Sequence, residues 1–255
     1  MNARLNRFAV SAGLAIAAAS VAAASTYQID WLQMAPTAFG SAPPTSGTYN
    51  LPGVGQVQMT YATDPDLVDA RSAVGALVTG SVNYGSDTYT WNNHEEFART
   101  NWAFSGILNT GWQVTYTFPG TVPAGQIILG VQGLGRRNAN PGENPQDCIS
   151  TATVQQNGTF LGDYINGNWG ATQYTGGPGT FSMQNSQTGW GGADPWWNTG
   201  LGLVRIDDAT NSLTVRFAQT AGDGVGVNIG VLVPEPSSAG LLALGGIVTF
   251  LRRRR

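Results

Sequence analysis

Lysine is absent from the 255-residue sequence, and cysteine and histidine occur once each, as Cys148 and His94. A single cysteine excludes an intrachain disulfide framework, and a single histidine excludes metal centres built from several histidines. Positive charge comes from 12 arginines alone, and residues 25–233 hold only six of them against fourteen acidic residues. This acidic stretch lacks the clustered basic residues that bind phosphates, so we expect no nucleic-acid partner.

Charged residues of either sign are scarce, at 11% of the chain, whereas glycine occurs 35 times and tryptophan eight times. Every tryptophan lies within residues 25–233, among many Ser, Thr, Asn and Gln residues. This composition is typical of a β-rich protein that works outside the cell. With about 209 residues, the stretch is also long enough to bury one sizeable core.

The N-terminus has the pattern of a secretory signal peptide. Two arginines precede an apolar run over residues 8–19, and small residues follow at Ala22 and Ala24. This combination predicts that signal peptidase cleaves between Ala24 and Ser25. Residues 1–24 are therefore expected to direct export and then to be removed. An uncleaved anchor is the alternative, but the weakly hydrophobic run argues against it.

A second short apolar segment, residues 239–251, lies close to the C-terminus. As a helix it would span about 20 Å, less than a bilayer core of about 30 Å, yet it can insert if flanking residues help. The chain ends in a strong stop-transfer signal, which would keep the tail in the cytoplasm and the body outside the inner membrane: Arg252, Arg253, Arg254 and Arg255. Before the segment, two prolines flank Glu235 and favour a stiff, extended stretch.

Residues 234–255 resemble the PEP-CTERM sorting signal, because the tripeptide Pro234, Glu235 and Pro236, an apolar helix and terminal arginines occur in the same order and spacing. The resemblance implies processing by an exosortase, a membrane-embedded transpeptidase-like enzyme of Gram-negative-type bacteria. The exosortase would remove the helix and the arginine tail and deliver the body to the cell surface or an extracellular polysaccharide matrix. Ser238 and Ala239 stand where the family often has Thr followed by an aromatic residue. A plain membrane anchor is the alternative.

Short β-type runs, bounded by Gly, Pro, Asn and Asp, recur along residues 25–233. Several alternate between apolar and polar residues, which places the apolar side chains on one face of a strand. The expected strands are 27–34, 56–62, 73–82, 88–91, 102–108, 112–118, 126–132, 151–155, 159–164, 180–183, 201–206, 212–218 and 225–233. About a dozen strands without a fixed-period repeat predict an all-β domain, a single β-sandwich of the jelly-roll type.

Turns and loops are expected at five places in this domain. The stretch 219–224 lies between two alternating runs and predicts a hairpin. Single helical turns are expected near Asp64 and over 94–100. The stretches 135–147 and 174–200 read as long loops, where a binding function would lie.

Catalytic groups have little support in the sequence. His94 is followed by Glu95 and Glu96, but no nucleophile-elbow motif accompanies it. A glycosidase needs two carboxyl groups facing each other across a cleft, and the body contains only one further glutamate, Glu143. We therefore expect no catalytic residues, although a glycan-active hydrolase is kept as a second alternative.

Carboxylates suggest at most a structural Ca²⁺ site, and no cofactor is expected. Asp64, Asp66 and Asp69 cluster within six residues, and 207–208 is an Asp-Asp pair beside a strand. Oxygen ligands at such spacing can hold Ca²⁺, but the EF-hand pattern is missing, so turn and cap roles are favoured. Cys148 reads as an isolated thiol in a loop rich in proline and asparagine, although an intermolecular bridge stays possible.

The tryptophans fall into two groups. Those within strand patterns are expected in the core: Trp31, Trp102 and Trp112. Less assured burial is expected beside asparagine and in the Gly-rich stretch: Trp91, Trp169, Trp190, Trp196 and Trp197. Exposed indole rings can stack on sugars, so the last three are a candidate glycan-binding site, with anchoring of the loop onto the sheet as the favoured alternative.

Together these features predict an exported protein in three parts: a signal peptide (1–24), a β-sandwich body (25–233) and a sorting signal (234–255). We expect it to cross the inner membrane, to be tethered there as a precursor, and to end at the cell surface or in the extracellular matrix without catalytic activity. The expected partners are signal peptidase, exosortase, the inner membrane and extracellular polysaccharide. A lectin-like module using the Trp-rich stretch is the first alternative.

Overall fold

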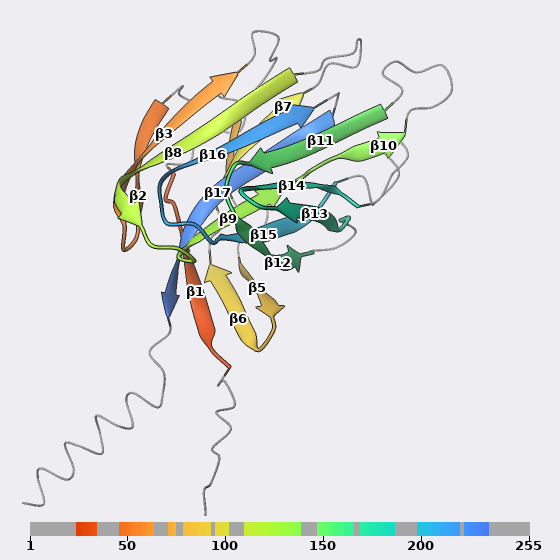
Figure 1. Cartoon of the computed structure of the whole chain (residues 1–255). Coiled ribbons are helices and arrows are strands. Elements are labelled where there is room, and N and C mark those ends of the chain that lie inside the picture. The colour runs from red at the N-terminus through yellow and green to blue at the C-terminus, as the bar shows by residue number, and fades with distance from the viewer. Residues whose placement is uncertain are drawn as a thin grey trace, which may run out of the picture.

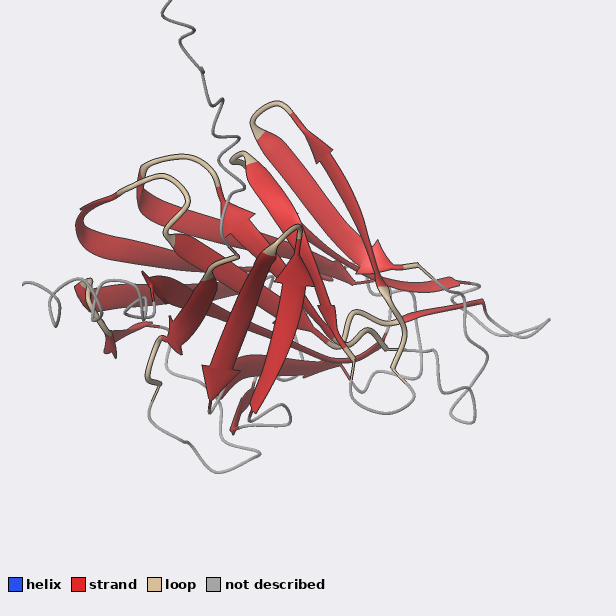
Figure 2. Cartoon of the chain, turned by 90° about the horizontal axis from the view of Figure 1, so that it is seen from below, coloured by secondary structure: helices blue, strands red, loops and turns tan. Residues whose placement is uncertain are grey.

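The computed structural model describes residues 24–34, 46–63, 71–74, 79–92, 95–101, 110–138, 147–165, 169–186, 198–219 and 222–234. Throughout these ranges the regular structure is β-strand, arranged in two sheets (Figures 1 and 2). The predicted all-β class is therefore confirmed, while the jelly-roll connectivity stays a prediction. In the described ranges, no helix with the length and apolar character to cross a membrane is found.

Sheet A has nine strands, with the main order β12-β15-β9-β17-β1-β6-β5 and with β7 joining β4 to β17. Its strands are β1 (Thr26–Trp31), β4 (Arg71–Val74), β5 (Thr79–Tyr84), β6 (Asp87–Asn92), β7 (Glu95–Asn101), β9 (Ile127–Gln132), β12 (Gly158–Tyr164), β15 (Leu201–Ile206) and β17 (Gly222–Pro234). The pair β1–β6 is parallel and the other pairs are antiparallel.

Sheet B has eight strands, with the main order β13-β14-β11-β16-β8-β3-β2 and with β10 paired to β11. Its strands are β2 (Ser46–Leu51), β3 (Gly55–Thr63), β8 (Thr110–Val122), β10 (Arg136–Asn138), β11 (Asp147–Val154), β13 (Thr172–Gly177), β14 (Thr180–Asn185) and β16 (Thr210–Gln219). All its pairs are antiparallel.

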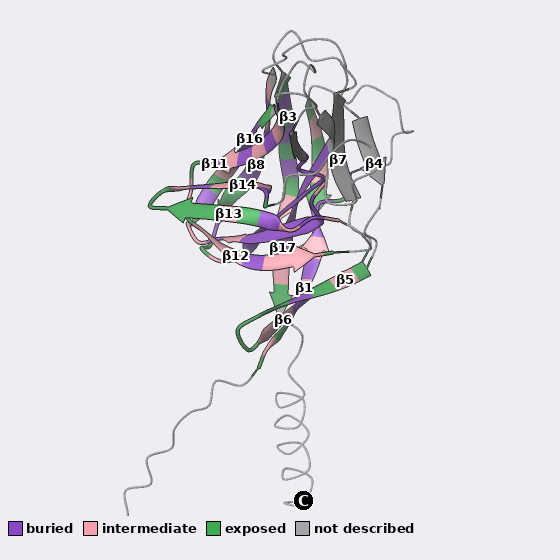
Figure 3. Ribbon diagram, turned by 90° about the vertical axis from the view of Figure 1, so that its right-hand side faces the viewer, coloured by how far each residue is buried: buried purple, intermediate pink, exposed green. Residues whose placement is uncertain are grey.

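The two sheets pack face to face over one apolar layer, which we call the inter-sheet core. Val114 and Val215 enter it from sheet B, and Leu129, Val204 and Val227 enter it from sheet A, all with 0% exposure. These residues are buried because the period-2 alternation predicted for β8, β16 and β17 directs every second side chain of each strand into this layer. Figure 3 shows the resulting alternation of buried and exposed positions along the strands.

Sheet A also encloses a second apolar layer, the sheet A core. Its buried residues all come from sheet A: Ile29, Trp31, Val82, Tyr89, Trp91, Ile128, Leu161, Leu201 and Leu203. Along β9, Ile127 and Leu129 belong to the inter-sheet core, whereas Ile128 belongs to the sheet A core. Neighbouring residues of a strand point to opposite faces, so the sheet A core lies on the face that is turned away from sheet B.

Sheet A curls so that β5 packs against β12, and this curl encloses the sheet A core. Two glycines mark the contact: a Cβ at Gly80 would lie 2.5 Å from the Trp91 ring and 2.8 Å from the Tyr164 ring, and one at Gly162 would lie 2.8 Å from Val82. The Trp91 and Tyr164 rings meet edge to face, with centroids 5.2 Å apart. Glycine is therefore required where the aromatic rings cover the backbone.

The predicted hairpin over 219–224 is wrong. β16 belongs to sheet B and β17 to sheet A, so the chain crosses between the sheets at this point. The physical reason is that both strands direct an apolar face, carrying Val215 and Val227 respectively, into the same inter-sheet core. Two such strands can both bury their apolar faces when they lie on opposite sides of that core.

Four other local predictions also need correction. The stretch 135–147, expected as a loop, contains β10, which pairs with β11. Residues 95–100 form most of β7 instead of a helical turn, because pairing with β17 and β4 satisfies their backbone groups. The expected loop over 174–200 contains most of the β13–β14 hairpin. Cys148 lies in β11, opposite Arg137 in the register, and not in a loop.

Candidate functional site

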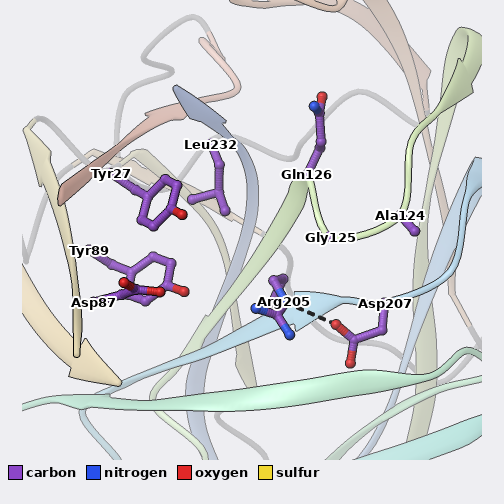
Figure 4. A pocket seen from close by; sticks show the side chains of 9 residues that line it. All are labelled: Tyr27, Asp87, Tyr89, Ala124, Gly125, Gln126, Arg205, Asp207 and Leu232. Carbon is purple, nitrogen blue, oxygen red and sulfur yellow. Dashed lines mark hydrogen bonds and ion pairs between the residues drawn. The ribbon is translucent and has the colours of Figure 1, made fainter. Parts of the chain in front are cut away.

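A pocket of about 390 Å³ opens at the end of sheet A where β1 begins and β17 ends (Figure 4). It is lined by Tyr27, Asp87, Tyr89, Ala124, Gly125, Gln126, Arg205, Asp207 and Leu232. Tyr89 belongs to the sheet A core, and Tyr27 and Leu232 pack against that core. The pocket therefore lies at the solvent-exposed end of the sheet A core.

Arg205 and Asp207 form the charged side of the pocket. The Arg205 Nε donates to Asp207 Oδ1 at 2.9 Å, and the Thr159 hydroxyl donates to Asp207 Oδ2 at 2.6 Å. Both charged side chains are 31% exposed. Burial disfavours the charge on Arg205, but the hydrogen bond and the charge of Asp207 outweigh it, so the pKa of Arg205 lies above its ordinary value. The guanidinium is thus fixed in position and in charge.

Two tyrosines form the opposite side. The rings of Tyr27 and Tyr89 stack at 5.4 Å between centroids with an angle of 18° between their planes. In Figure 4 both rings lie across the pocket from Arg205, and the Gln126 side chain extends upward in the view, away from the rings and from Arg205. Burial raises the pKa of Tyr89, and the charge of Arg205 only partly opposes this. The Tyr89 hydroxyl therefore stays protonated at neutral pH and can donate a hydrogen bond.

A second polar cluster lies at the turns next to the pocket. Asp208 accepts hydrogen bonds from the backbone N–H of Asn157 at 2.7 Å and from its side-chain amide at 2.9 Å. Asn157 Oδ1 in turn accepts from the Gly179 N–H at 2.8 Å. The hydrogen bonds from Asn157 lower the pKa of the Asp208 carboxyl. The cluster connects three turns by hydrogen bonds. Of the Asp-Asp pair noted in the sequence, Asp207 binds Arg205 and Asp208 binds Asn157.

Both sides of the pocket can act on one ligand. The guanidinium, the tyrosine hydroxyls and the Gln126 amide can donate hydrogen bonds, while the Asp87 carboxylate and the Gln126 oxygen can accept them. The aromatic and aliphatic walls provide apolar surface. Such a mixture suits a small neutral molecule with several hydroxyl groups. Among the described residues, no group of three His, Cys, Asp or Glu side chains could hold a metal ion.

Few of the candidate residues named from the sequence lie within the described ranges. Pro234 ends β17, with Tyr27 of β1 as its register partner, and Ala24 and Ser25 directly precede β1. The following selected residues lie outside the described ranges: Ala22, Asp64, Asp66, Asp69, His94, Trp190, Trp196, Trp197, Glu235, Pro236, Arg252, Arg253, Arg254 and Arg255. The glycan and Ca²⁺ predictions on these residues stay predictions.

The described tryptophans divide differently from the prediction. Trp31 and Trp112 are buried as expected, at 4% and 3% exposure. Trp91, whose burial was less assured from the sequence, is 1% exposed, because the curl of sheet A covers it. Trp169 is half-buried, and Trp102 lies outside the described ranges.

Apart from Asp207, the pocket residues were missed by sequence reasoning, although one signal was present. Arg205 interrupts an apolar strand, Leu201–Ile206, in a body that has only six arginines. A charged residue in such a strand requires a partner, and Asp207 is two positions away. No comparable signal marks Tyr27, Asp87 or Tyr89, because their proximity arises from the parallel pairing of β1 with β6.

Comparison with known proteins identifies one feature, at the C-terminus. The family model of the PEP-CTERM protein-sorting motif matches residues 232–255. The match begins inside β17, two residues before the Pro-Glu-Pro tripeptide. No curated protein and no solved structure matches the chain. The chain thus carries a PEP-CTERM sorting signal, as predicted, which implies an exported protein with a membrane-anchored precursor that is processed by an exosortase.

Proposed function

We propose that the protein is a non-catalytic component of the cell surface or of an extracellular polysaccharide matrix, released from its membrane anchor by exosortase. Residues 1–24 act as a cleaved signal peptide, residues 25–233 as the mature β-sandwich body, and residues 234–255 as the removed sorting signal. A jelly-roll arrangement of the body is part of this proposal.

The observation that carries the proposal is the position of the sorting signal relative to the fold. Pro234 is the last residue of β17 and is the register partner of Tyr27, two residues beyond Ser25. The predicted N-terminal cleavage point directly precedes β1, and the predicted C-terminal one lies at or just after the end of β17, its neighbour at one end of sheet A (Figure 1). Both can be cut without removing a residue of either hydrophobic core.

Mass spectrometry of the protein from its native cells tests this proposal. The expected mature chain starts at Ser25 and ends within residues 234–237, and deletion of the exosortase should leave the C-terminal tail attached. An intact tail ending in Arg255 in exosortase-containing cells would refute processing and favour a plain anchor.

Carbohydrate binding is a second candidate function, and the pocket is the observation that favours it. The side chains of Tyr27, Gln126 and Arg205 combine a ring with donors and acceptors around a space of about 390 Å³. A hexose fits such a pocket, because ligand sites typically measure about 300–1,000 Å³. The Trp-rich stretch stays a separate candidate for the same activity.

Titration calorimetry with neutral oligosaccharides prepared from the extracellular polysaccharide separates the two candidate sites. Gln126→Ala should weaken binding at the pocket by about tenfold, which corresponds to the loss of about 1.4 kcal/mol. The double variant Trp196→Ala and Trp197→Ala serves as the matched test of the other site. Undetectable binding by the unmodified protein would remove the carbohydrate function altogether.

A further inference from the structure

Ser25 is held against the first residues of β6. Its backbone N–H donates to Asp87 Oδ1 at 3.2 Å, and its carbonyl accepts from the Thr88 N–H at 2.9 Å. Both Ser25 and Asp87 are half-buried, whereas Ala24 is exposed. The structure therefore anchors the chain on β6 directly after the predicted cleavage point.

Cleavage would change the chemistry of this nitrogen. Water adds its hydroxyl to the carbonyl carbon of Ala24, the C–N bond breaks, and Ser25 keeps the nitrogen as an amine. At neutral pH the released Ala24 carboxyl gives up a proton and the Ser25 amine takes one up. An amide with one N–H thus becomes an ammonium group with three donors and a full positive charge, while the signal peptide leaves with the carboxylate.

We propose that Asp87 is the binding site for the α-ammonium group that signal-peptide removal creates at Ser25. This inference rests on the cleavage between Ala24 and Ser25 in the proposed function. The hydrogen bond from the uncharged amide N–H to the Asp87 carboxylate becomes an ion pair between two full charges at the same position. Signal-peptide removal during export would then strengthen the contact between the start of β1 and β6. Without this contact the new chain end would fray.

The charges around Asp87 are compatible with this role. The side chains of Arg205 and Asp207 line the same pocket, but they bind each other at 2.9 Å, and Asp87 is the pocket carboxylate that accepts a hydrogen bond from Ser25. Tyr27 and Tyr89 are the other titratable groups there. In the precursor this pocket holds two carboxylates and one guanidinium, and the new ammonium balances the remaining negative charge.

The absence of lysine makes the test direct, because the α-amino group is the single amine of the mature protein. The full chain is produced in a secreting host, and the purified exported protein is treated with a trace of acetic anhydride at pH 7.5. Asp87→Asn keeps an acceptor oxygen but removes the charge. We expect its amine to react at least about threefold faster than that of the unmodified protein.

Asp208→Asn is the matched control, because it removes an exposed carboxylate that binds Asn157 instead. It should react at the unmodified rate, and all three proteins should react alike in urea. Equal rates for folded wild type and Asp87→Asn would overturn the Asp87 site. A mature chain that mass spectrometry shows to start elsewhere would instead refute the cleavage point.

A second measurement needs no variant. Reductive methylation with ¹³C-formaldehyde places a single NMR label on the α-amino group and preserves its charge. The pKa of this group should be higher in the folded protein than in urea, because a nearby carboxylate favours the charged form. An equal or lower pKa in the folded protein would overturn the proposal even if Asp87→Asn does not fold.

Discussion

The two apolar cores of this protein are built in different ways. The inter-sheet core is supplied by both sheets and consists largely of aliphatic residues at alternating strand positions, such as Val225, Val227 and Ile229. The sheet A core is supplied by one sheet and depends on large rings, Trp31, Tyr89 and Trp91, of which Trp31 and Trp91 pack over glycine. The first core follows from strand alternation, whereas the second requires a particular curvature.

This difference shows what each core requires of the sequence. Strands with apolar residues at every second position can fill the inter-sheet core with many combinations of Val, Leu and Ile. The sheet A core needs glycine at Gly80 and Gly162, because a side chain there would collide with Tyr164 or Val82. We therefore expect the inter-sheet core to tolerate substitution better than the contact between β5 and β12.

Truncation of one ring in each core should have the largest effect. Trp91→Ala removes a ring that is 1% exposed in the sheet A core, and Phe217→Ala removes the ring stacked on Trp112 at 4.1 Å in the inter-sheet core. Each should lower the free energy of unfolding by about 3–5 kcal/mol. Denaturant unfolding measures both effects. A separate early transition in Trp91→Ala alone would show that the cores unfold independently.

Addition of one methyl group at the β5–β12 contact should have an intermediate effect. Gly80→Ala places a Cβ 2.5 Å from the Trp91 ring, so it should lower the free energy of unfolding by about 1–3 kcal/mol. Gly120→Ala in β8 is the matched control, since its Cβ would meet nothing within 4 Å. The control should change stability by less than about 0.5 kcal/mol. Equal stability of the two variants would argue against close packing of β5 on β12.

Removal of one half-buried carboxylate between the sheets should have the smallest effect. Asp163 of β12 accepts a hydrogen bond at 2.8 Å from the Thr172 N–H of β13, which links sheet A to sheet B. Burial raises the pKa of Asp163 above its ordinary value of 3.8, although hydrogen bonds from Thr172 partly oppose this. The folded state therefore holds this proton more tightly than the unfolded state, and the stabilisation is complete only below pH 3.8.

As the pH rises above 3.8 and through the folded-state pKa, the contribution of Asp163 to stability should be lost. Asp163→Asn lacks this titration, so its stability relative to the unmodified protein should increase over that range. Denaturant unfolding at a series of pH values measures the difference. A difference that is independent of pH would show that Asp163 is not buried as described.

Much of the fold was predictable because the signals were local. The strand over 201–206 has the predicted bounds, and the alternation of β8, β16 and β17 identified the face that is buried. The partners of these strands were not predictable, because β16 and β17 resemble a hairpin although they lie in different sheets. Pairing depends on which faces share a core, and this information is spread over the whole chain.

The sorting signal was predictable from local sequence, whereas the pocket was not. The Pro234, Glu235 and Pro236 tripeptide and the arginine tail form one contiguous segment, so the sequence alone predicted the signal that comparison confirms. The pocket joins Tyr27, Tyr89 and Arg205 from three strands, of which two meet only through the parallel β1–β6 pair. The pocket thus depends on tertiary structure.

The position of β17 has a mechanical consequence for the precursor while its C-terminal segment anchors it in the membrane. β17 pairs with β1, β9 and β7, so it lies inside sheet A and not at an edge. A pull along its axis would load the hydrogen bonds to these neighbours together, in shear, instead of opening them one at a time. Forced unfolding is governed by the unfolding rate, and such a geometry slows it. A tethered body of this design would resist the drag of flowing water at its point of attachment.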